Sequence, residues 1–138
     1  MGPSIRDAGF RSGSVAIIGA PNVGKSTLLN ALLGQKTAIV SDKPQTTRHK
    51  ILGVLRRPDA EIVLVDTPGI HQPRFQLNRR IVRVAKHVLD EVDCVFFMIE
   101  ARTHAGRKDC SIIDLLRERT LPVILLINKI DLVRKQKL

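Results

Sequence analysis

The sequence predicts one α/β domain with three layers, in which helices cover both faces of a mostly parallel sheet. Its 138 residues are enough for a single domain core, and 43% of them are hydrophobic. Short apolar runs of strand length alternate with amphipathic helical patterns, and this alternation favours right-handed crossovers between parallel strands. The longest apolar runs fall well short of the roughly 20 residues that a membrane-spanning helix requires, so no transmembrane helix is predicted.

Strands are expected where apolar residues run for strand length between turn residues. They cover residues 14–19, 51–56, 61–66, 94–100 and 122–128. The second and third of these runs are separated only by Arg57-Pro-Asp-Ala60, a short turn that predicts an antiparallel hairpin. The sheet is therefore expected to be mixed, with one antiparallel edge strand. Apolar residues at helical spacing predict helices at residues 25–33, about 78–89 and about 107–117.

The net charge indicates the kind of partner to expect, and the cysteine content indicates the cellular compartment. The net charge of +10 suits an anionic partner such as nucleic acid or acidic lipid. Cys94 and Cys110 lack the spacing of a metal site, so free thiols in a reducing cytoplasm are expected. Residues 1–12 are too polar for a secretory signal. They are expected to form a flexible leader before a domain of residues 13–138.

The strongest motif is a glycine-rich turn between a predicted strand and a predicted helix. It reads G-A-P-N-V-G-K-S-T and matches G-x-x-x-x-G-K-[ST], a phosphate-binding loop of the P-loop NTPase fold. Its backbone N–H groups and the helix N-terminus favour bound phosphates. Lys25 is expected to reach the β- and γ-phosphates, and the Ser26 hydroxyl to bind Mg²⁺. A chance glycine-rich turn is the weaker interpretation. The expected nucleotide contacts are Gly19, Asn22, Val23, Gly24, Lys25, Ser26 and Thr27.

A second motif, D-T-P-G, follows the apolar strand at 61–66, where a Walker-B carboxylate is expected. Asp66 would hold Mg²⁺ directly or through water, and the Gly69 N–H would approach the γ-phosphate. Between the two motifs, residues 40–50 are polar and rich in turn formers. This loop could close over the γ-phosphate and supply a hydroxyl ligand to Mg²⁺ from Thr47 or Thr46. The competing interpretations are an ordinary turn and a plain surface loop.

The third motif is N-K-I-D, residues 128–131, at the end of another predicted strand. The Asp131 carboxylate can accept hydrogen bonds from both the N1–H and the N2 amino group of guanine, whereas adenine offers no such pair of donors. Asn128 would brace the loop and the Lys129 stem would cover the base. A site that hydrogen-bonds its ligand rejects an analogue without those groups by roughly 10⁴ to 10⁵. GTP is therefore expected rather than ATP.

Together these motifs resemble the Era family of P-loop GTPases, in the TrmE-Era-EngA-like class. The resemblance rests on G-A-P-N-V-G-K-S-T-L-L-N, S-D-K-P-Q-T-T-R-H-K-I-L-G-V, V-D-T-P-G-I and I-N-K-I-D, and extends over nearly everything after residue 13. It implies that Thr47 rather than Thr46 binds Mg²⁺. It also implies an apolar residue after Gly69, where Ile70 stands, in place of the glutamine that orients water in Ras-like proteins.

The missing water-orienting glutamine raises the question of what assists hydrolysis. Some members of the wider group use a K⁺ ion held by the phosphate-loop asparagine, and Asn22 stands at that position. A cation there would neutralise charge that develops between the β- and γ-phosphates. The expected catalytic set is therefore Lys25, Thr47, Gly69 and Asn22. His71 as a base and Arg48 as an arginine finger are weaker alternatives.

The resemblance also implies partners and a location. Era proteins carry a KH domain that binds 16S rRNA and promotes small-subunit maturation, and this sequence is expected to lack both that domain and the S-A loop of the guanine pocket. A cytoplasmic GTPase of small ribosomal subunit assembly is implied, with peripheral association at the inner membrane as a further expectation. The basic segment at residues 74–87 is either a solvated helix face or a contact for ribosomal RNA. The alternative function is a basic RNA-associated scaffold with weak or no hydrolysis.

Overall fold

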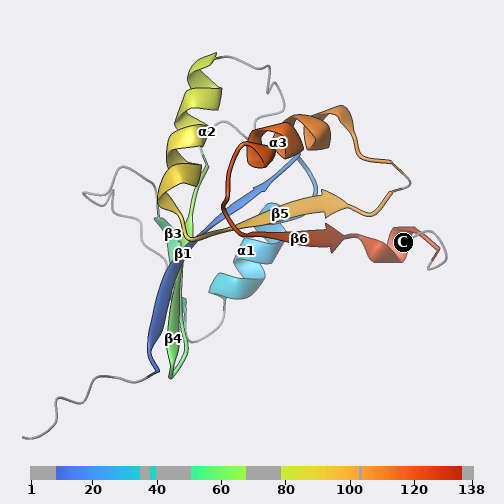
Figure 1. Cartoon of the computed structure of the whole chain (residues 1–138). Helices are drawn as coiled ribbons and strands as arrows, with labels where there is room; N and C mark the ends of the chain where they lie inside the picture. Colours follow the sequence, from blue (N-terminus) through green and yellow to red (C-terminus); the bar gives the residue numbers. More distant parts are fainter. Residues whose placement is uncertain (1–8, 35–37, 40–50, 68–78, 103, 135–138) are drawn as a thin grey trace, which may run out of the picture.

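The computed structural model describes residues 9–34, 38–39, 51–67, 79–102 and 104–134, which form one mixed sheet with helices on both faces (Figure 1). The strands are β1 (Arg11–Gly19), β2 (Ala38–Ile39), β3 (Ile51–Arg56), β4 (Ala60–Val65), β5 (Cys94–Glu100) and β6 (Val123–Asn128). The helices are α1 (Lys25–Leu33), α2 (Arg79–Glu91), α3 (Arg107–Arg117) and the short 3₁₀ helix η1 (Ile130–Leu132). No helix in these ranges is long and apolar enough to cross a bilayer.

The sheet has six strands in the order β2-β3-β4-β1-β5-β6. Strands β4, β1, β5 and β6 are parallel, whereas β3 is antiparallel to both β2 and β4. The predicted mixed α/β sheet is therefore confirmed. The prediction that the antiparallel strand lies at the edge is wrong, because β2 pairs with the outer side of β3. Strand β2, Ala38–Ile39, has only two residues, which are too few to show an alternation of apolar and polar residues. It could therefore not be predicted from the sequence.

The two faces of the sheet explain the alternating apolar residues of β1. Ala16 and Ile18 pack in one cluster with residues of α2 and α3, whereas Val15 and Ile17 pack in a second cluster against α1. Successive strand side chains point to opposite faces, so one apolar run serves both layers. Figure 1 shows α2 and α3 on one side of the sheet and α1 on the other. The α2 and α3 residues of the first cluster are Ala85, Val88, Leu89, Ile112, Leu115 and Leu116.

Most element boundaries agree with the expected ones. The hairpin between β3 and β4 closes through Arg57 and Ala60, whose backbone groups bond each other in both directions. The start of β1 differs, because Arg11 lies inside the expected leader of residues 1–12. The Arg11 N–H donates to the Asp59 carbonyl at 2.9 Å, so backbone pairing extends this strand where its polar side chains gave no signal.

The topology gathers the motifs at one end of the sheet. The chain leaves β1 at Gly19, β4 at Val65, β5 at Glu100 and β6 at Asn128, and these strands are parallel. Their carboxyl ends therefore meet at one edge, and the connections after β1 and β5 lead to opposite faces of the sheet (Figure 1). In open α/β sheets, ligands bind at such a place.

Candidate nucleotide-binding site

The phosphate loop joins β1 to α1, and two of its glycines are required by close packing. A Cβ at Gly19 would overlap the Met98 carbonyl oxygen of β5. Gly24 has φ +109°, and a Cβ there would also overlap the Asn128 side-chain nitrogen. These contacts hold the loop against β5 and against the end of β6, so the glycine spacing follows from the fold as well as from phosphate binding.

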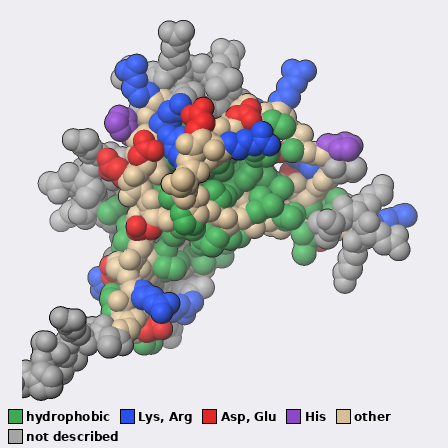
Figure 2. All heavy atoms as spheres, viewed as in Figure 1, with side chains coloured by type: hydrophobic (Ala, Val, Ile, Leu, Met, Phe, Trp, Pro, Cys, Tyr) green, Lys and Arg blue, Asp and Glu red, His purple; other side chains and the backbone are tan. Residues whose placement is uncertain are grey.

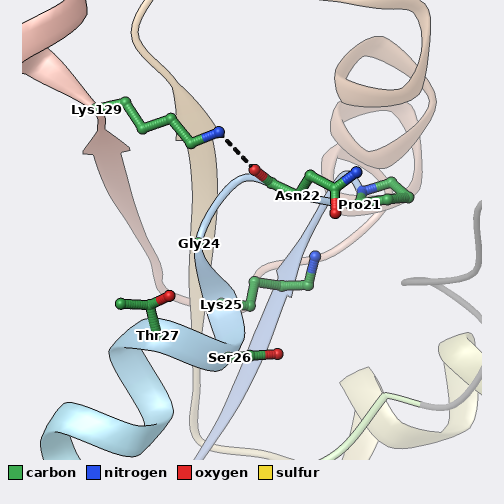
Figure 3. Close-up of a pocket in the computed structure, with 7 residues that line it drawn as sticks. All are labelled: Pro21, Asn22, Gly24, Lys25, Ser26, Thr27 and Lys129. Carbon is green, nitrogen blue, oxygen red and sulfur yellow. Dashed lines mark hydrogen bonds between the residues drawn. The ribbon is translucent and has the colours of Figure 1, made fainter.

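A cavity of about 470 Å³ opens over this loop (Figure 3). Its lining combines the loop, the first turn of α1 and one residue directly after β6. The cavity is within the size range of small-ligand sites. It therefore brings the phosphate-loop residues and the lysine of N-K-I-D to one place. The lining residues are Pro21, Asn22, Gly24, Lys25, Ser26, Thr27 and Lys129.

Lys25 is the first residue of α1, and its side chain bonds the backbone of the phosphate loop. Its ammonium group donates to the Gly19 carbonyl at 2.8 Å and to the Ala20 carbonyl at 2.6 Å. Partial burial lowers the pKa of Lys25 below the ordinary value of a lysine, because desolvation disfavours the charged form. The two carbonyl acceptors hold this partly desolvated ammonium where α1 begins.

The loop after β6 is bonded directly to the phosphate loop. The Asn128 side-chain amide donates to the Val23 carbonyl at 2.8 Å, and the Lys129 ammonium donates to the Asn22 carbonyl at 2.7 Å. The role of Asn128 in bracing the loop and the base stays a prediction, and this hydrogen bond to the phosphate loop supports it. Asp131 lies exposed in η1, next to this loop, and does not line the cavity.

The structure describes part of the predicted metal site. Ser26 is in the first turn of α1, and the half-buried Asp66 directly follows β4. The next residue, Thr67, is buried and its hydroxyl donates to the Ile17 carbonyl at 3.3 Å, which ties the start of this loop to β1. Thr47 and Gly69 lie outside the described residues.

The donor types at this end of the sheet suit Mg²⁺. The ion prefers hard oxygen ligands, and in phosphate-binding sites it takes only one or two protein ligands besides phosphates and water. A hydroxyl and a carboxylate are such ligands. Within the described part of the chain there is no cluster of three or more His, Cys, Asp or Glu side chains that could form a cage made of protein alone.

Glu100 contacts the residues of the site but was not predicted from the sequence as a site residue. Glu100, the last residue of β5, accepts a hydrogen bond from the Lys129 ammonium at 3.2 Å and pairs with the Arg102 guanidinium at 3.1 Å. The hydrogen bond from Lys129 is the main reason that the pKa of Glu100 lies below its ordinary value. The sequence did offer a signal for Glu100, because it is an acidic residue at the end of a predicted strand. Asp66 was predicted as a site residue from the same kind of position.

Asn22 has the left-handed backbone conformation, with φ +64°. Its carbonyl faces Lys129, and its side chain points away from that lysine (Figure 3).

Cys94 and Cys110 are free thiols, in agreement with the sequence.

Comparison with known proteins agrees with this geometry. Residues 14–129 match the family described as 50S ribosome-binding GTPase. GTPase Era of Geobacter metallireducens is 56% identical over 129 residues, which make up 94% of this chain and 43% of that protein. A crystal structure of an Era variant from Aquifex aeolicus bound to GDP·AlF₄⁻ is 44% identical, with a TM-score of 0.65, and the match covers 91% of this chain and 44% of that one.

A second solved structure contains Era in complex with MgGDPNP and nucleotides 1506–1542 of 16S ribosomal RNA. It is 46% identical, with a TM-score of 0.65, and the match covers 88% of this chain and 42% of that one. The chain thus spans less than half the length of these relatives. They confirm the resemblance to Era that the motifs indicated. With a phosphate loop and an N-K-I-D loop joined at one cavity, the chain belongs to the 50S ribosome-binding GTPase family.

Proposed function

We propose that the chain binds and hydrolyses GTP and that it acts, as Era-like proteins do, in small ribosomal subunit assembly. The observation that carries this proposal is the direct bonding of the N-K-I-D loop to the phosphate loop, through Asn128 to Val23 and through Lys129 to Asn22. One guanine nucleotide can then contact both loops at once. The solved Era structures with GDP·AlF₄⁻ and with MgGDPNP support the same ligand class.

In the proposed site the phosphate loop binds the nucleotide phosphates through its backbone N–H groups and through Lys25. Ser26, Thr47 and Asp66 would hold Mg²⁺, which neutralises phosphate charge when bound. The Gly69 N–H would contact the γ-phosphate. At the other end, Asn128 and Lys129 hold the loop that places Asp131 against guanine. These roles for Thr47, Gly69 and Asp131 come from the sequence motifs alone.

The proposed hydrolysis uses positioning and charge stabilisation more than proton transfer by a side chain. Ile70 has no polar atom that could orient water, so other groups have to stabilise the developing charge. Lys25 is one such group. Asn22 as a ligand of K⁺ would supply another cation at the β- to γ-phosphate bridge. The position of Asn22 in the phosphate loop and in the cavity lining supports this role.

Ribosomal RNA is the proposed macromolecular partner. An Era relative forms a complex with a segment of 16S ribosomal RNA, and the net charge of +10 favours a polyanion. The cytoplasm is the proposed location, and peripheral contact with the inner membrane stays a prediction. The alternative of a basic scaffold without nucleotide chemistry is not favoured, because the cavity brings together the residues of a nucleotide site.

Nucleotide binding and phosphate release test the proposal. Fluorescent GDP, GTP and ATP analogues are titrated with Mg²⁺, and phosphate release from GTP is then followed. We expect guanine nucleotides to bind at least about 10³-fold more tightly than ATP, since adenine leaves the polar groups of the base site unpaired. Equal affinity for GTP and ATP would contradict the proposal, and GTP binding without phosphate release would reduce it to a binding function.

A further inference from the structure

Glu100 lies between the two loops of the nucleotide site. It ends β5 in register with Asn128, the last residue of β6. The N–H of the next residue, Ala101, donates to the Asn128 carbonyl at 2.8 Å. This backbone pairing fixes the Glu100 side chain at the point where the N-K-I-D loop leaves the sheet.

One ammonium group links Glu100 to the phosphate loop. The Lys129 ammonium donates to the Asn22 carbonyl at 2.7 Å and to Glu100 Oε2 at 3.2 Å. Arg102 contacts the same carboxylate oxygen at 3.1 Å. The Glu100 side chain is only 26% exposed, so the carboxylate is partly shielded from water by the groups that it binds.

Two residues of this linkage have an unusual backbone conformation. Asn22 has φ +64° and Lys129 has φ +58°, and in the described part of the chain these are the only non-glycine residues with positive φ. Such conformations persist when the surrounding structure holds them, and they are common at functional sites. Here the two residues bond each other, and Glu100 binds the nitrogen that joins them.

A lysine alone would hold the two loops loosely. Its ammonium group is carried on a flexible four-carbon stem and has three donors that can turn to different acceptors. A carboxylate on the far side of the nitrogen gives one donor a charged acceptor, and such charge-assisted bonds are stronger than neutral ones. Glu100 therefore restricts the directions in which Lys129 can point and favours its contact with Asn22.

We propose that Glu100 is a positioning residue of the nucleotide site, which holds Lys129 against the Asn22 carbonyl and thereby slows the release of guanine nucleotides. This inference rests on the proposed function. Glu100 touches neither phosphate nor base in this role. It acts through Lys129, so its removal should affect nucleotide retention more than the rate of the chemical step.

The test compares Glu100→Ala with a matched control, Glu61→Ala, in the full chain. Glu61 also forms a surface ion pair on the sheet, with Arg56 at 3.0 Å, and its side chain is likewise 26% exposed. We expect Glu100→Ala to raise the dissociation rate of a fluorescent GDP analogue about three- to tenfold, the range for losing a partly exposed charged hydrogen bond. The rate of GTP hydrolysis at saturation should change less than twofold. Glu61→Ala should leave both rates unchanged.

A double-mutant cycle separates positioning from general stability. If Glu100 acts through Lys129, adding Glu100→Ala to Lys129→Met should not raise the GDP dissociation rate further. Equal dissociation rates for Glu100→Ala and the wild type, equal effects of the two glutamate substitutions, or additive effects in the cycle would each overturn the proposal.

Hydrogen exchange without nucleotide makes the inference testable even if the proposed function fails. In the nucleotide-free protein, Glu100→Ala should speed amide exchange in residues 20–24 and 128–132, whereas Glu61→Ala should not. Unchanged exchange in both loops would overturn the positioning role by itself. Failure of the wild type to bind guanine nucleotides would instead overturn the proposed function, and with it the retention effect.

Discussion

At the scale of single residues, Gly24 shows why a phosphate loop tolerates so little change. Its φ of +109° is strained for any residue with a Cβ, and that Cβ would meet the Asn128 side chain. Gly24→Ala should therefore lower the free energy of unfolding by about 1–3 kcal/mol and weaken GDP binding at least tenfold. Urea unfolding and GDP titration measure the two effects.

Gly13 provides the control for this substitution. It lies in β1, and an added Cβ there would make only an ordinary contact with Asp93 at 3.5 Å. Gly13→Ala should change neither the unfolding free energy nor the GDP affinity by a comparable amount. If Gly24→Ala behaved like Gly13→Ala, the close packing of the phosphate loop against the end of β6 would not be required.

A further prediction concerns Asn22 and its proposed role as a ligand of K⁺. If its side chain helps to hold K⁺, Asn22→Ala should reduce the ratio of the GTP hydrolysis rates in K⁺ and in Na⁺ to about one, because the protein would no longer distinguish the two ions. Phosphate release in matched chloride salts measures this ratio. An unchanged ratio in the variant would exclude Asn22 as the ligand.

The site residues differ in how far the sequence predicted them. The phosphate loop and N-K-I-D could be recognised because their chemistry depends on local spacing. Glu100 could not be assigned its role, because its contact with Lys129 depends on the pairing of β5 with β6. The roles of Thr47 and Gly69 stay predictions, because both residues lie outside the described residues.

At the scale of elements, β6 has a neighbour on one side only among the described residues, because it pairs with β5 alone. Four of its large apolar side chains are more than two-fifths exposed, and hydrophobic side chains reach the surface in this region (Figure 2). An uncharged edge strand of this kind offers backbone groups for pairing with another chain. The exposed side chains are Val123, Ile124, Leu125 and Ile127.

The 138-residue chain should therefore self-associate, and Leu125→Lys should reduce that association because a charge opposes edge pairing. Leu125 is 52% exposed, and so is Phe10, which directly precedes β1. Phe10→Lys adds the same charge at a matched exposure and should leave the association unchanged. Light scattering over a range of concentrations measures it, and equal effects of both substitutions would point to net charge rather than to β6.

The junction of β1 and β5 predicts a pH dependence of stability. Asp93 accepts hydrogen bonds from the Ser14 N–H at 2.7 Å and the Ser14 hydroxyl at 3.0 Å, and the backbone bond in particular lowers the pKa of Asp93. A lowered folded-state pKa stabilises the protein above the ordinary value of 3.8, and the gain is lost as the pH falls through the folded-state pKa.

The Asp93→Asn variant tests this dependence, because it lacks the titrating carboxylate. The wild type should be more stable than Asp93→Asn above about pH 4, and the difference should narrow at lower pH. Urea unfolding of both proteins between about pH 3 and pH 6 measures the difference. A difference that stays constant over this range would show that the ionised carboxylate makes no special contribution.

The elements themselves were predictable where their patterns were long. Helices α1 and α3 have the predicted bounds, since apolar residues recur at helical spacing between clear breaks. The start of β1 and the whole of β2 were missed, because backbone pairing rather than an apolar pattern defines them. The order of the strands in the sheet could not be predicted from the sequence either, because the pairing partners depend on the packing of the whole sheet.

At the scale of the whole molecule, the positive charge predicts salt-sensitive association with RNA. Each phosphate neutralised by Lys or Arg contributes about one unit to the slope of log affinity against log salt. Arg83, exposed on α2 in the basic segment, is the described residue best suited to such a contact. Arg83→Glu should weaken the association with small ribosomal subunits and lower the slope by about one.

Arg117→Glu is the control, since Arg117 is an exposed residue of α3 outside the basic segment at residues 74–87. The same change of charge at Arg117 should alter the slope of log affinity against log salt less than Arg83→Glu does. Equal losses for the two variants would mean that total charge, and not the segment around α2, governs the association.

The hydrogen bonds of Lys25 have a consequence for how nucleotides would enter and leave. Its ammonium group already has two backbone acceptors, the carbonyls of Gly19 and Ala20. An ammonium group has three N–H donors, so a phosphate oxygen can accept from Lys25 while both carbonyls keep it in place, and each further bond to phosphate exchanges a carbonyl acceptor for a phosphate oxygen. The same carbonyls can receive the lysine again as phosphate departs, so that its charge need not lose every partner during release.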